Sequence, residues 1–368
     1  MKKNPLLELK SFGQSVWCDY IERQSLMSGD IKKMIEAGEI VGITSNPTIF
    51  EKAISSSPYY DYDILNHLER QHECDVDCLY ETLITEDVRL AADLLRPIYE
   101  LTNGVDGLVS IEVSPRLAHD SDATIAEARR LFSILDRPNI LIKVPATPEG
   151  LPAITTLIGA GINVNVTLMF SVEQYMDVSA AYLAGLEELA ANGGDLNRVS
   201  SVASFFVSRI DTAVDKLLPA ASPLRGMIAI ANARVAYARF REVFRSNRFA
   251  ALKERGARVQ RVLWASTSVK DPKYRDVRYV EGLIGPDTVN TMPPVTLDAF
   301  RDHGQPHLSL TDECLDAVHQ IGQLKEMGID FDAVTRQLTE EGVILFRRSY
   351  DSLLAALQEK CSMVGHTI

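Results

Sequence analysis

Short apolar segments alternate along this chain with longer segments of helical character, and this alternation constrains the fold most. Eight of the short segments have the length and composition of strands: Ser15–Asp19, Ile40–Thr44, Gly107–Val113, Ile140–Pro145, Ile162–Leu168, Val199–Phe206, Val259–Ala265 and Val277–Leu283. The alternation is typical of parallel βα units, and eight strands is the number that closes a (β/α)8 barrel. We therefore predict an α/β fold, a single (β/α)8 TIM barrel in one domain over residues 1–368.

Helices are expected between these strands, with insertions and two further helices near the end of the chain. The expected helices are Asp30–Ala37, Thr85–Leu101, Ala123–Leu135, Pro148–Leu157, Val172–Ala191, Ser208–Leu218 and Pro223–Phe244. The insertions run from about Glu51 to Thr85 and through the long helical stretch before Val259. Past the eighth strand, Thr311–Met327 and Phe331–Gln358 predict two C-terminal helices.

Composition argues against several classes of partner. The formal net charge of −12 disfavours nucleic acid or an anionic membrane, although a local cluster of Arg and Lys can still bind an anionic substrate. We find no apolar run as long as a membrane span and no signal-peptide segment at the start, so we expect no membrane association. The odd number and scattered placing of Cys18, Cys74, Cys78, Cys314 and Cys361 suit reduced thiols in a cytoplasm.

A lysine lies in the middle of one strand-like segment, Asn139–Thr147. Burial of an ammonium group is costly and favours the neutral amine. A neutral amine on a rigid strand can attack a carbonyl group and form a Schiff base, which makes Lys143 a candidate nucleophile. The alternative is that only the stem of Lys143 is buried while its head reaches solvent, and this strand alone leaves both open.

Candidate site residues, most of them polar, also gather where the expected strands end, which is where barrel enzymes carry their chemistry. These residues lie late on a strand or just after one: Asp19, Asn46, Glu112, Lys143, Asn165, Thr167, Ser204, Phe206, Arg209 and Ser266. Parallel strands would bring them to one face, so we predict a site there.

Each of these residues also has a structural interpretation. Asp19 could cap a helix or pair with a cation, and Asn46 before Pro47 could cap the next helix. Thr167 could be a β-branched core residue. Arg209 could pair with Asp211 on a solvated helix face.

Several motifs, in the correct order, resemble the transaldolase family. They are Val41–Thr48, Asn139–Thr147, Asn163–Thr167, Phe205–Asp211 and Trp264–Ser268, and the last of them is similar to the longer bacterial branch. The resemblance implies a barrel of the class I aldolase type, circularly permuted, with the Schiff-base lysine on the fourth strand. It also implies transfer of a dihydroxyacetone unit from sedoheptulose 7-phosphate to glyceraldehyde 3-phosphate. The products would be erythrose 4-phosphate and fructose 6-phosphate, in the pentose phosphate pathway.

The resemblance implies catalytic roles that suit the chemistry of the side chains. Lys143 would form the imine, and the carboxylate of Asp19 would take and return the C4 hydroxyl proton. Glu112 would shuttle protons through a water held by Thr167. The substrate-binding residues would be Asn46, Asn165, Ser204, Phe206, Arg209 and Ser266, with Arg209 and Ser266 at the phosphate.

One position departs from the family pattern. Better-known transaldolases carry an arginine two residues after the serine that aligns with Ser266, and here that position is Ser268. Lys270 is the nearest cation, so we predict that it supplies the second phosphate charge, although Asp271 beside it could tie it to the surface.

Other functions stay open beside the transferase. A class I aldolase that cleaves fructose 6-phosphate needs the same Lys143, and an inactive barrel could merely bind sugar phosphates. No organic cofactor is expected, because the lysine supplies the electrophile. No metal is expected either: Cys74 with Cys78 and His303 with His307 are spaced in pairs but lack further ligands. The sequence leaves monomer and homodimer open.

Overall fold

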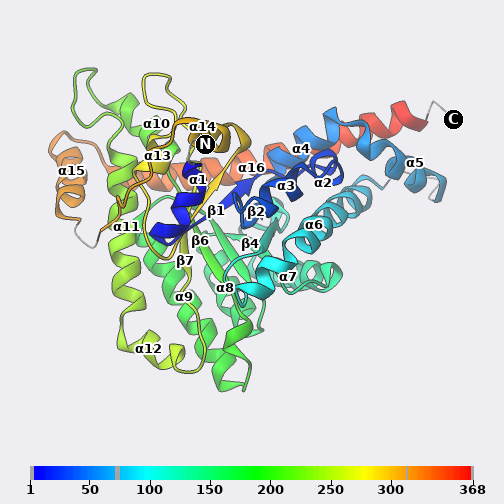
Figure 1. Cartoon of the computed structure of the whole chain (residues 1–368), viewed down its shortest axis with the longest axis horizontal. Coiled ribbons are helices and arrows are strands. Elements are labelled where there is room, and N and C mark those ends of the chain that lie inside the picture. The colour runs from blue at the N-terminus through cyan, green and yellow to red at the C-terminus, as the bar shows by residue number, and fades with distance from the viewer. Residues whose placement is uncertain (1–3, 71–74, 312–313, 366–368) are drawn as a thin grey trace.

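Eight parallel strands form a closed barrel in the computed structural model, which describes residues 4–70, 75–311 and 314–365 (Figure 1). Each strand pairs with its successor, and β1 pairs with β8. The strands are β1 (Gln14–Asp19), β2 (Gly42–Thr44), β3 (Leu108–Glu112), β4 (Ile140–Pro145), β5 (Val164–Met169), β6 (Ser201–Phe206), β7 (Arg261–Ala265) and β8 (Thr288–Met292). The predicted (β/α)8 barrel is therefore confirmed.

The eighth strand was predicted in the wrong place. The segment Val277–Leu283 contains a one-turn helix, α13 (Arg278–Glu281), and its buried residues Val277 and Val280 are spaced as on a helix. The true β8 has a polar sequence, and its buried Thr288 and Asn290 side chains accept hydrogen bonds. Gln14 Nε2 donates to Thr288 Oγ1 at 2.9 Å, so a polar strand is stable in the barrel wall.

Helices surround the barrel. They are α1 (Pro5–Leu9), α2 (Arg23–Met27), α3 (Asp30–Glu36), α4 (Pro47–Ser56), α5 (Asp61–Arg70), α6 (Val76–Leu101), α7 (Ser121–Leu135), α8 (Gly150–Gly159), α9 (Val172–Ala191), α10 (Ser208–Leu217), α11 (Ile228–Phe244), α12 (Asn247–Lys253), α13, α14 (Pro294–His303), α15 (Leu315–Glu326) and α16 (Phe331–Gly365). Short 3-10 turns cover η1 (Lys10–Phe12), η2 (Pro58–Tyr60), η3 (Pro115–Leu117) and η4 (Leu196–Arg198). Local signals start several of these helices. Ser171 and Gln174 form a capping box at α9, for example.

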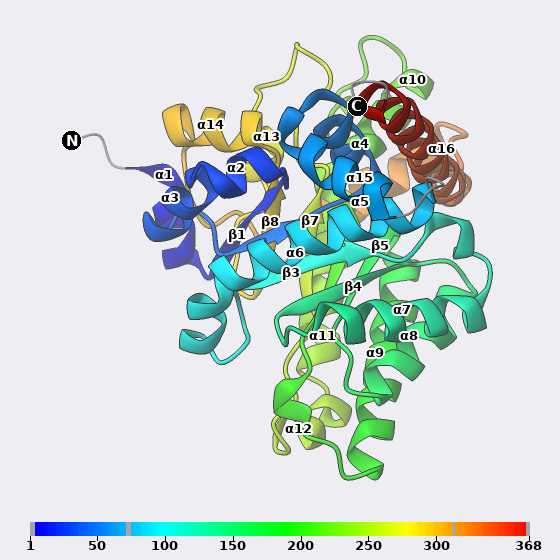
Figure 2. The same ribbon diagram turned by 90° about the vertical axis from the view of Figure 1, so that its right-hand side faces the viewer.

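The long helix α16 runs across one end of the barrel, beside α4 and α5 of the first predicted insertion (Figures 1 and 2). Both C-terminal helices were predicted, and α16 continues to Gly365. Its Lys360 is buried, with Nζ 3.0 Å from the Ile54 carbonyl oxygen and 2.9 Å from an Asp61 oxygen. These contacts fix the far part of α16 to the insertion.

Among the described residues, no helix is long and apolar enough to cross a membrane. Cys18, Cys78 and Cys314 are free thiols, and Cys74 lies outside the described residues.

Candidate active site

The register of three neighbouring strands places Glu112, Lys143 and Asn165 side by side. Glu112 on β3 is opposite Lys143 on β4, which is opposite Asn165 on β5. The Lys143 ammonium forms an ion pair with Glu112 Oε1 and donates to the Ser45 carbonyl oxygen at 2.8 Å. Only 6% of the Lys143 side chain is exposed, so its head lies inside the barrel mouth and the solvent-reaching alternative is wrong.

Asp19 ends β1 and faces the same space. Its Oδ1 accepts a hydrogen bond from Thr44 Oγ1 at 2.7 Å. Burial raises the pKa of Asp19, whereas the Thr44 hydrogen bond and the charges of Lys143 and Lys270 act in the opposite direction. The next helix, α2, begins after Glu22, so Asp19 caps no helix there.

Glu112 and Thr167 meet at a small cavity beside Lys143. Burial raises the pKa of Glu112, and the charge of Asp19 adds to this effect, while Lys143 opposes it. Thr167 Oγ1 is buried and has no hydrogen-bond partner among the described residues. The cavity between these side chains measures about 20 Å³, which is room for roughly one water molecule.

The strand that carries Thr167 is irregular at this point. The pairing of β5 with β6 shifts register between Val166 and Met169, and Leu168 has a left-handed backbone with φ of 59°. A buried leucine rarely adopts this conformation, so packing must hold it there.

Two asparagines differ in their surroundings. Asn165 is fully buried: its Nδ2 donates to Ser110 Oγ at 2.9 Å and its Oδ1 accepts from Ser204 Oγ at 2.7 Å. Asn46 caps α4, with Oδ1 accepting from the Ile49 amide at 3.1 Å. The capping interpretation of Asn46 is thus correct, and its side chain also borders the main cavity.

The main cavity has a volume of about 600 Å³ and opens at the C-terminal ends of the strands. Its lining includes Asp19, Asn46, Lys52, Lys143, Thr167, Ser204, Phe206, Arg209, Ser266 and Lys270. Most of the predicted site residues therefore meet in one space. Glu112 borders the small cavity instead, and Asn165 lies behind the wall.

Cations gather on one side of the main cavity. Burial and the nearby charge of Arg209 lower the pKa of Lys270, and Lys52 on α4 adds to this effect. Burial also lowers the pKa of Arg209. Asp211 does not pair with Arg209, because its oxygens accept from the Ala229 amide at 2.8 Å and the Tyr279 hydroxyl at 2.9 Å.

Three serines lie next to this group of cations. Ser266 has a left-handed backbone with φ of 55°, and its Oγ is 3.0 Å from Ser208 Oγ. Lys270 Nζ donates to Ser268 Oγ at 2.7 Å. The lysine therefore points back over Ser268, and Asp271 does not hold it, because Asp271 accepts from the Lys273 amide.

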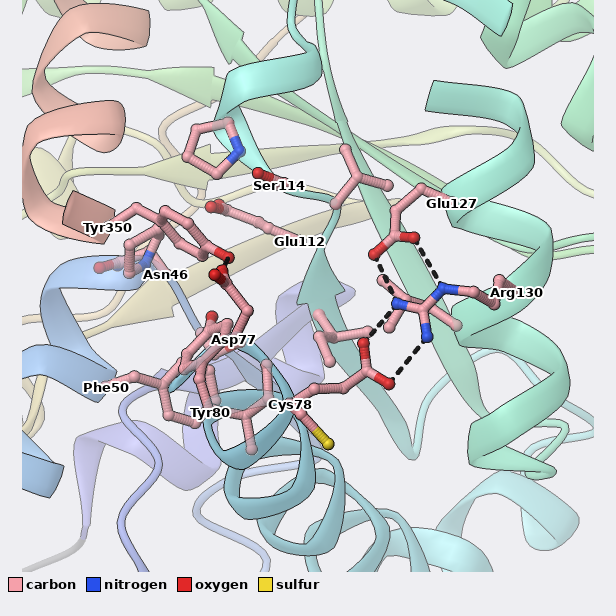
Figure 3. Close-up of a pocket in the computed structure, with 18 residues that line it drawn as sticks. Asn46, Phe50, Asp77, Cys78, Tyr80, Glu112, Ser114, Glu127, Arg130 and Tyr350 are labelled. Atoms are coloured by element: carbon pink, nitrogen blue, oxygen red, sulfur yellow. Dashed lines mark hydrogen bonds and ion pairs between the residues drawn. The ribbon is translucent and has the colours of Figure 1, made fainter. Parts of the chain in front are cut away.

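A second cavity of about 390 Å³ lies on another side of Glu112 (Figure 3). There Tyr350 donates to Asp77 Oδ1 at 3.2 Å, and Arg130 pairs with Glu127 and Glu81. This cavity shares Glu112 with the site but contains neither Lys143 nor Asp19. Within the described ranges, no group of three His, Cys, Asp or Glu side chains is arranged to hold a metal ion.

Sequence reasoning missed several residues at the site, among them Thr44, Lys52 and Phe346. Thr44 could have been found, since it ends a predicted strand two residues before Asn46. Lys52 and Phe346 lie on α4 and α16, outside the strand ends, and no periodicity distinguishes them from surface or core residues.

A parallel barrel that holds a buried lysine between two carboxylates at its C-terminal mouth defines an enzyme of the imine-forming kind. The family model for transaldolase/fructose-6-phosphate aldolase matches residues 16–357. The chain is 45% identical to Transaldolase 2 of Nostoc punctiforme, over 99% of this chain and 100% of that protein. It is 49% identical to a transaldolase of Saccharopolyspora erythraea (98% and 99% covered) and 50% identical to one of Mycobacterium ulcerans (97% of each). The chain belongs to the transaldolase/fructose-6-phosphate aldolase family.

Proposed function

We propose that this chain is a transaldolase of the pentose phosphate pathway. It would transfer a dihydroxyacetone unit from sedoheptulose 7-phosphate to glyceraldehyde 3-phosphate, giving erythrose 4-phosphate and fructose 6-phosphate. The observation that carries the proposal is the enclosed Lys143 ammonium, paired with Glu112 and facing Asp19 across a cavity lined with cations. The names of the full-length relatives agree with it.

Imine formation begins at Lys143. Lys143 first gives its ammonium proton to Glu112; the amine then adds to the C2 carbonyl of the ketose, and loss of water from the carbinolamine gives the iminium. Glu112 is in contact with Nζ and has a raised pKa, so it is suited to accept and return protons in this step. The small cavity beside Thr167 has room for the water that carries them.

Carbon–carbon cleavage uses the iminium as an electron sink. Asp19 takes the proton of the C4 hydroxyl as the C3–C4 bond breaks, and it returns that proton when the acceptor aldehyde condenses. Asn46 and Ser204 border the space around Lys143 and are placed to hold the dihydroxyacetone hydroxyls. Asn165 lies behind the cavity wall, so it would act by orienting Ser204, whose hydroxyl donates to its amide oxygen. Phe206 walls the cavity.

The substrate phosphate binds at the opposite side of the cavity. Arg209 offers a bidentate guanidinium, and Lys270 provides the charge that Ser268 lacks. Ser266 adds a hydroxyl donor. The added charge of Lys52 suits a dianionic group in a protein that is acidic overall.

The alternative is an aldolase that cleaves fructose 6-phosphate without an acceptor, since the family includes such enzymes. Borohydride trapping with fructose 6-phosphate, followed by peptide mapping, tests the shared intermediate. We expect the adduct on Lys143 and none in Lys143→Arg, and an adduct on another lysine would overturn the proposal. Product analysis with and without erythrose 4-phosphate separates transferase from aldolase.

The proposal also covers the domain organisation, the cellular location and the oligomeric state of the enzyme. One core cluster includes residues from Leu6 to Cys361, which supports a single domain over residues 1–368. Sugar-phosphate substrates and reduced thiols suit the cytoplasm. A monomer or a homodimer would serve, because every proposed site residue comes from one chain.

A further inference from the structure

We infer that Phe346 on α16 determines how the imine intermediate is used: it limits water at Lys143 and so favours transfer over release of dihydroxyacetone. This inference rests on the proposed role of Lys143 as the imine-forming residue. It concerns a side chain far along the sequence from every strand end.

The Phe346 ring covers the lysine. Its centroid is 5.9 Å from Lys143 Nζ, and only 7% of the residue is exposed. Phe346 borders both the main cavity and the 20 Å³ cavity, where Val343 lies beside it. Lys143 and Thr167 border both cavities as well, so the ring forms part of the wall between the larger, open space and a space for roughly one water next to Glu112.

A glycine on α16 allows the helix to approach the barrel this closely. A Cβ at Gly342 would lie 2.9 Å from Cδ2 of Leu168, so a larger residue would push the helix or that side chain away. Leu168 is the left-handed residue in the irregular part of β5, directly after Thr167. Phe346 lies one helical turn after Gly342, on the same face of α16.

Contacts on both sides of Phe346 hold α16 in place. Before it, Gln174 Nε2 donates to Thr339 Oγ1 at 3.0 Å. After it, Ser349 Oγ is 2.8 Å from Thr48 Oγ1, and Tyr350 packs edge-on against Tyr80 with centroids 5.3 Å apart. The part of α16 that carries Phe346 is thus fixed to α9, α4 and α6, and its position does not depend on the contact of Phe346 with the barrel alone.

The chemistry shows why water at this point matters. After cleavage, the dihydroxyacetone unit remains on Lys143 as an enamine. In transfer, the enamine carbon attacks the acceptor aldehyde, and the new alkoxide takes the proton from Asp19. In release, that carbon takes a proton instead, water adds to C2 of the iminium, the C–N bond breaks, and dihydroxyacetone leaves a free lysine amine.

Both routes end in hydrolysis of one imine, and the water consumed equals the water lost when that imine formed. One retained water therefore suffices for either route, and the routes differ in whether the enamine carbon takes a proton or attacks the acceptor. Additional water beside the enamine supplies protons and nucleophile before the acceptor arrives, and this raises release. Replacement of Phe346 by a small residue opens the small cavity to the main one.

The test compares two rates in the purified full chain with fructose 6-phosphate as donor. Release is the formation of dihydroxyacetone without acceptor, and transfer is the formation of sedoheptulose 7-phosphate with erythrose 4-phosphate. We expect Phe346→Ala to raise the ratio of release to transfer by about tenfold, while Phe346→Leu changes it less. The matched control is Ile344→Ala, on the same helix but 49% exposed, which should keep the wild-type ratio.

Gly342→Val provides a second variant, because its side chain would meet Leu168 and force α16 or that side chain to move without altering Phe346. A wild-type ratio in folded Phe346→Ala overturns the inference. If Phe346→Ala does not fold, a wild-type ratio in folded Phe346→Leu overturns it equally. The proposed function fails separately, if borohydride traps no adduct on Lys143 of the unmodified enzyme.

Discussion

Thr44 donates its hydroxyl hydrogen to Asp19 across 2.7 Å, and this hydrogen bond is the end of a short series. Thr44 Oγ1 is also 2.6 Å from Thr291 Oγ1 on β8. Because an ionised carboxylate can only accept, the hydrogen of Thr44 points to Asp19 and Thr291 must donate to Thr44. Three strands thus orient one carboxylate and favour its charged form against the effect of burial.

This series predicts a shift in the pH profile. Thr44→Val keeps the side-chain shape but removes the donor, so the pKa of Asp19 should rise. As the pH falls, Asp19 should then become protonated at a higher pH than in the wild type. Loss of one hydrogen bond to a charged group, worth about 1.5 kcal/mol, moves the acid limb of kcat/KM up by about one pH unit. Thr44→Ser should keep the wild-type limb. An unmoved limb in Thr44→Val would show that Asp19 is not the group that titrates.

The two carboxylates should fail at different steps. Glu112 contacts Lys143, whereas Asp19 approaches from β1. Glu112→Gln should slow formation of the borohydride-trapped adduct, because the proton shuttle is lost. Asp19→Asn should still form the adduct but accumulate it, since cleavage stalls. Single-turnover trapping measures both, and equal adduct rates in the two variants would contradict these assignments.

The phosphate side of the cavity can be tested residue by residue. Lys270→Ala should raise KM for phosphorylated substrates about tenfold, as expected for loss of a charged hydrogen bond of roughly 1.5–3 kcal/mol. Arg209→Ala should have a larger effect, and Lys52→Ala a smaller one, because Lys52 is exposed. Activity on unphosphorylated glyceraldehyde should hardly change.

The surface variant Lys33→Ala, at an exposed ion pair with Asp30, is the control for loss of a charge. If Lys270→Ala leaves KM at the wild-type value, the phosphate is held by Arg209 and hydroxyl groups without this lysine.

A buried carboxyl outside the site predicts a pH dependence of stability. Burial raises the pKa of Asp211 to about 6, even though the Ala229 amide and the Tyr279 hydroxyl donate to it. The folded chain therefore binds this proton more tightly than the unfolded chain does. The protonated Asp211 carboxyl therefore adds to the free energy of unfolding. This contribution is complete below about pH 4, and roughly 2–3 kcal/mol of it is lost as the pH rises through about 6.

Asp211→Asn should flatten this part of the profile, because the amide stays neutral and can still accept from Ala229. Tyr279→Phe should instead extend the loss to higher pH, because it removes a donor that lowers the pKa of Asp211. Thermal unfolding between pH 4 and 8 measures both. Parallel profiles for the wild type and Asp211→Asn would assign the effect to another group.

Local sequence predicted what depends on local periodicity. Lys143 could be proposed because a lysine in the middle of an apolar strand is costly to bury, and Asp19 and Glu112 because strands in a parallel barrel end together. The polar strand β8 was missed because its stability comes from hydrogen bonds inside the barrel, such as that from Gln14 to Thr288. Phe346 could not be placed, since contacts between distant parts of the chain, such as the packing of Gly342 on Leu168, bring that turn of α16 to the lysine.

The position of α16 in the sequence has a consequence for biosynthesis. All eight strands have left the ribosome before Phe346 is made, and the interval from Met292 to Phe346 lasts roughly 3–10 s at ordinary elongation rates. During that time a nascent barrel can already present Lys143, but without the helix that covers it. On a ribosome-bound chain the unshielded amine of Lys143 would be exposed to cellular aldehydes and ketones. The extent of unwanted reaction with them would depend on how quickly α16 docks.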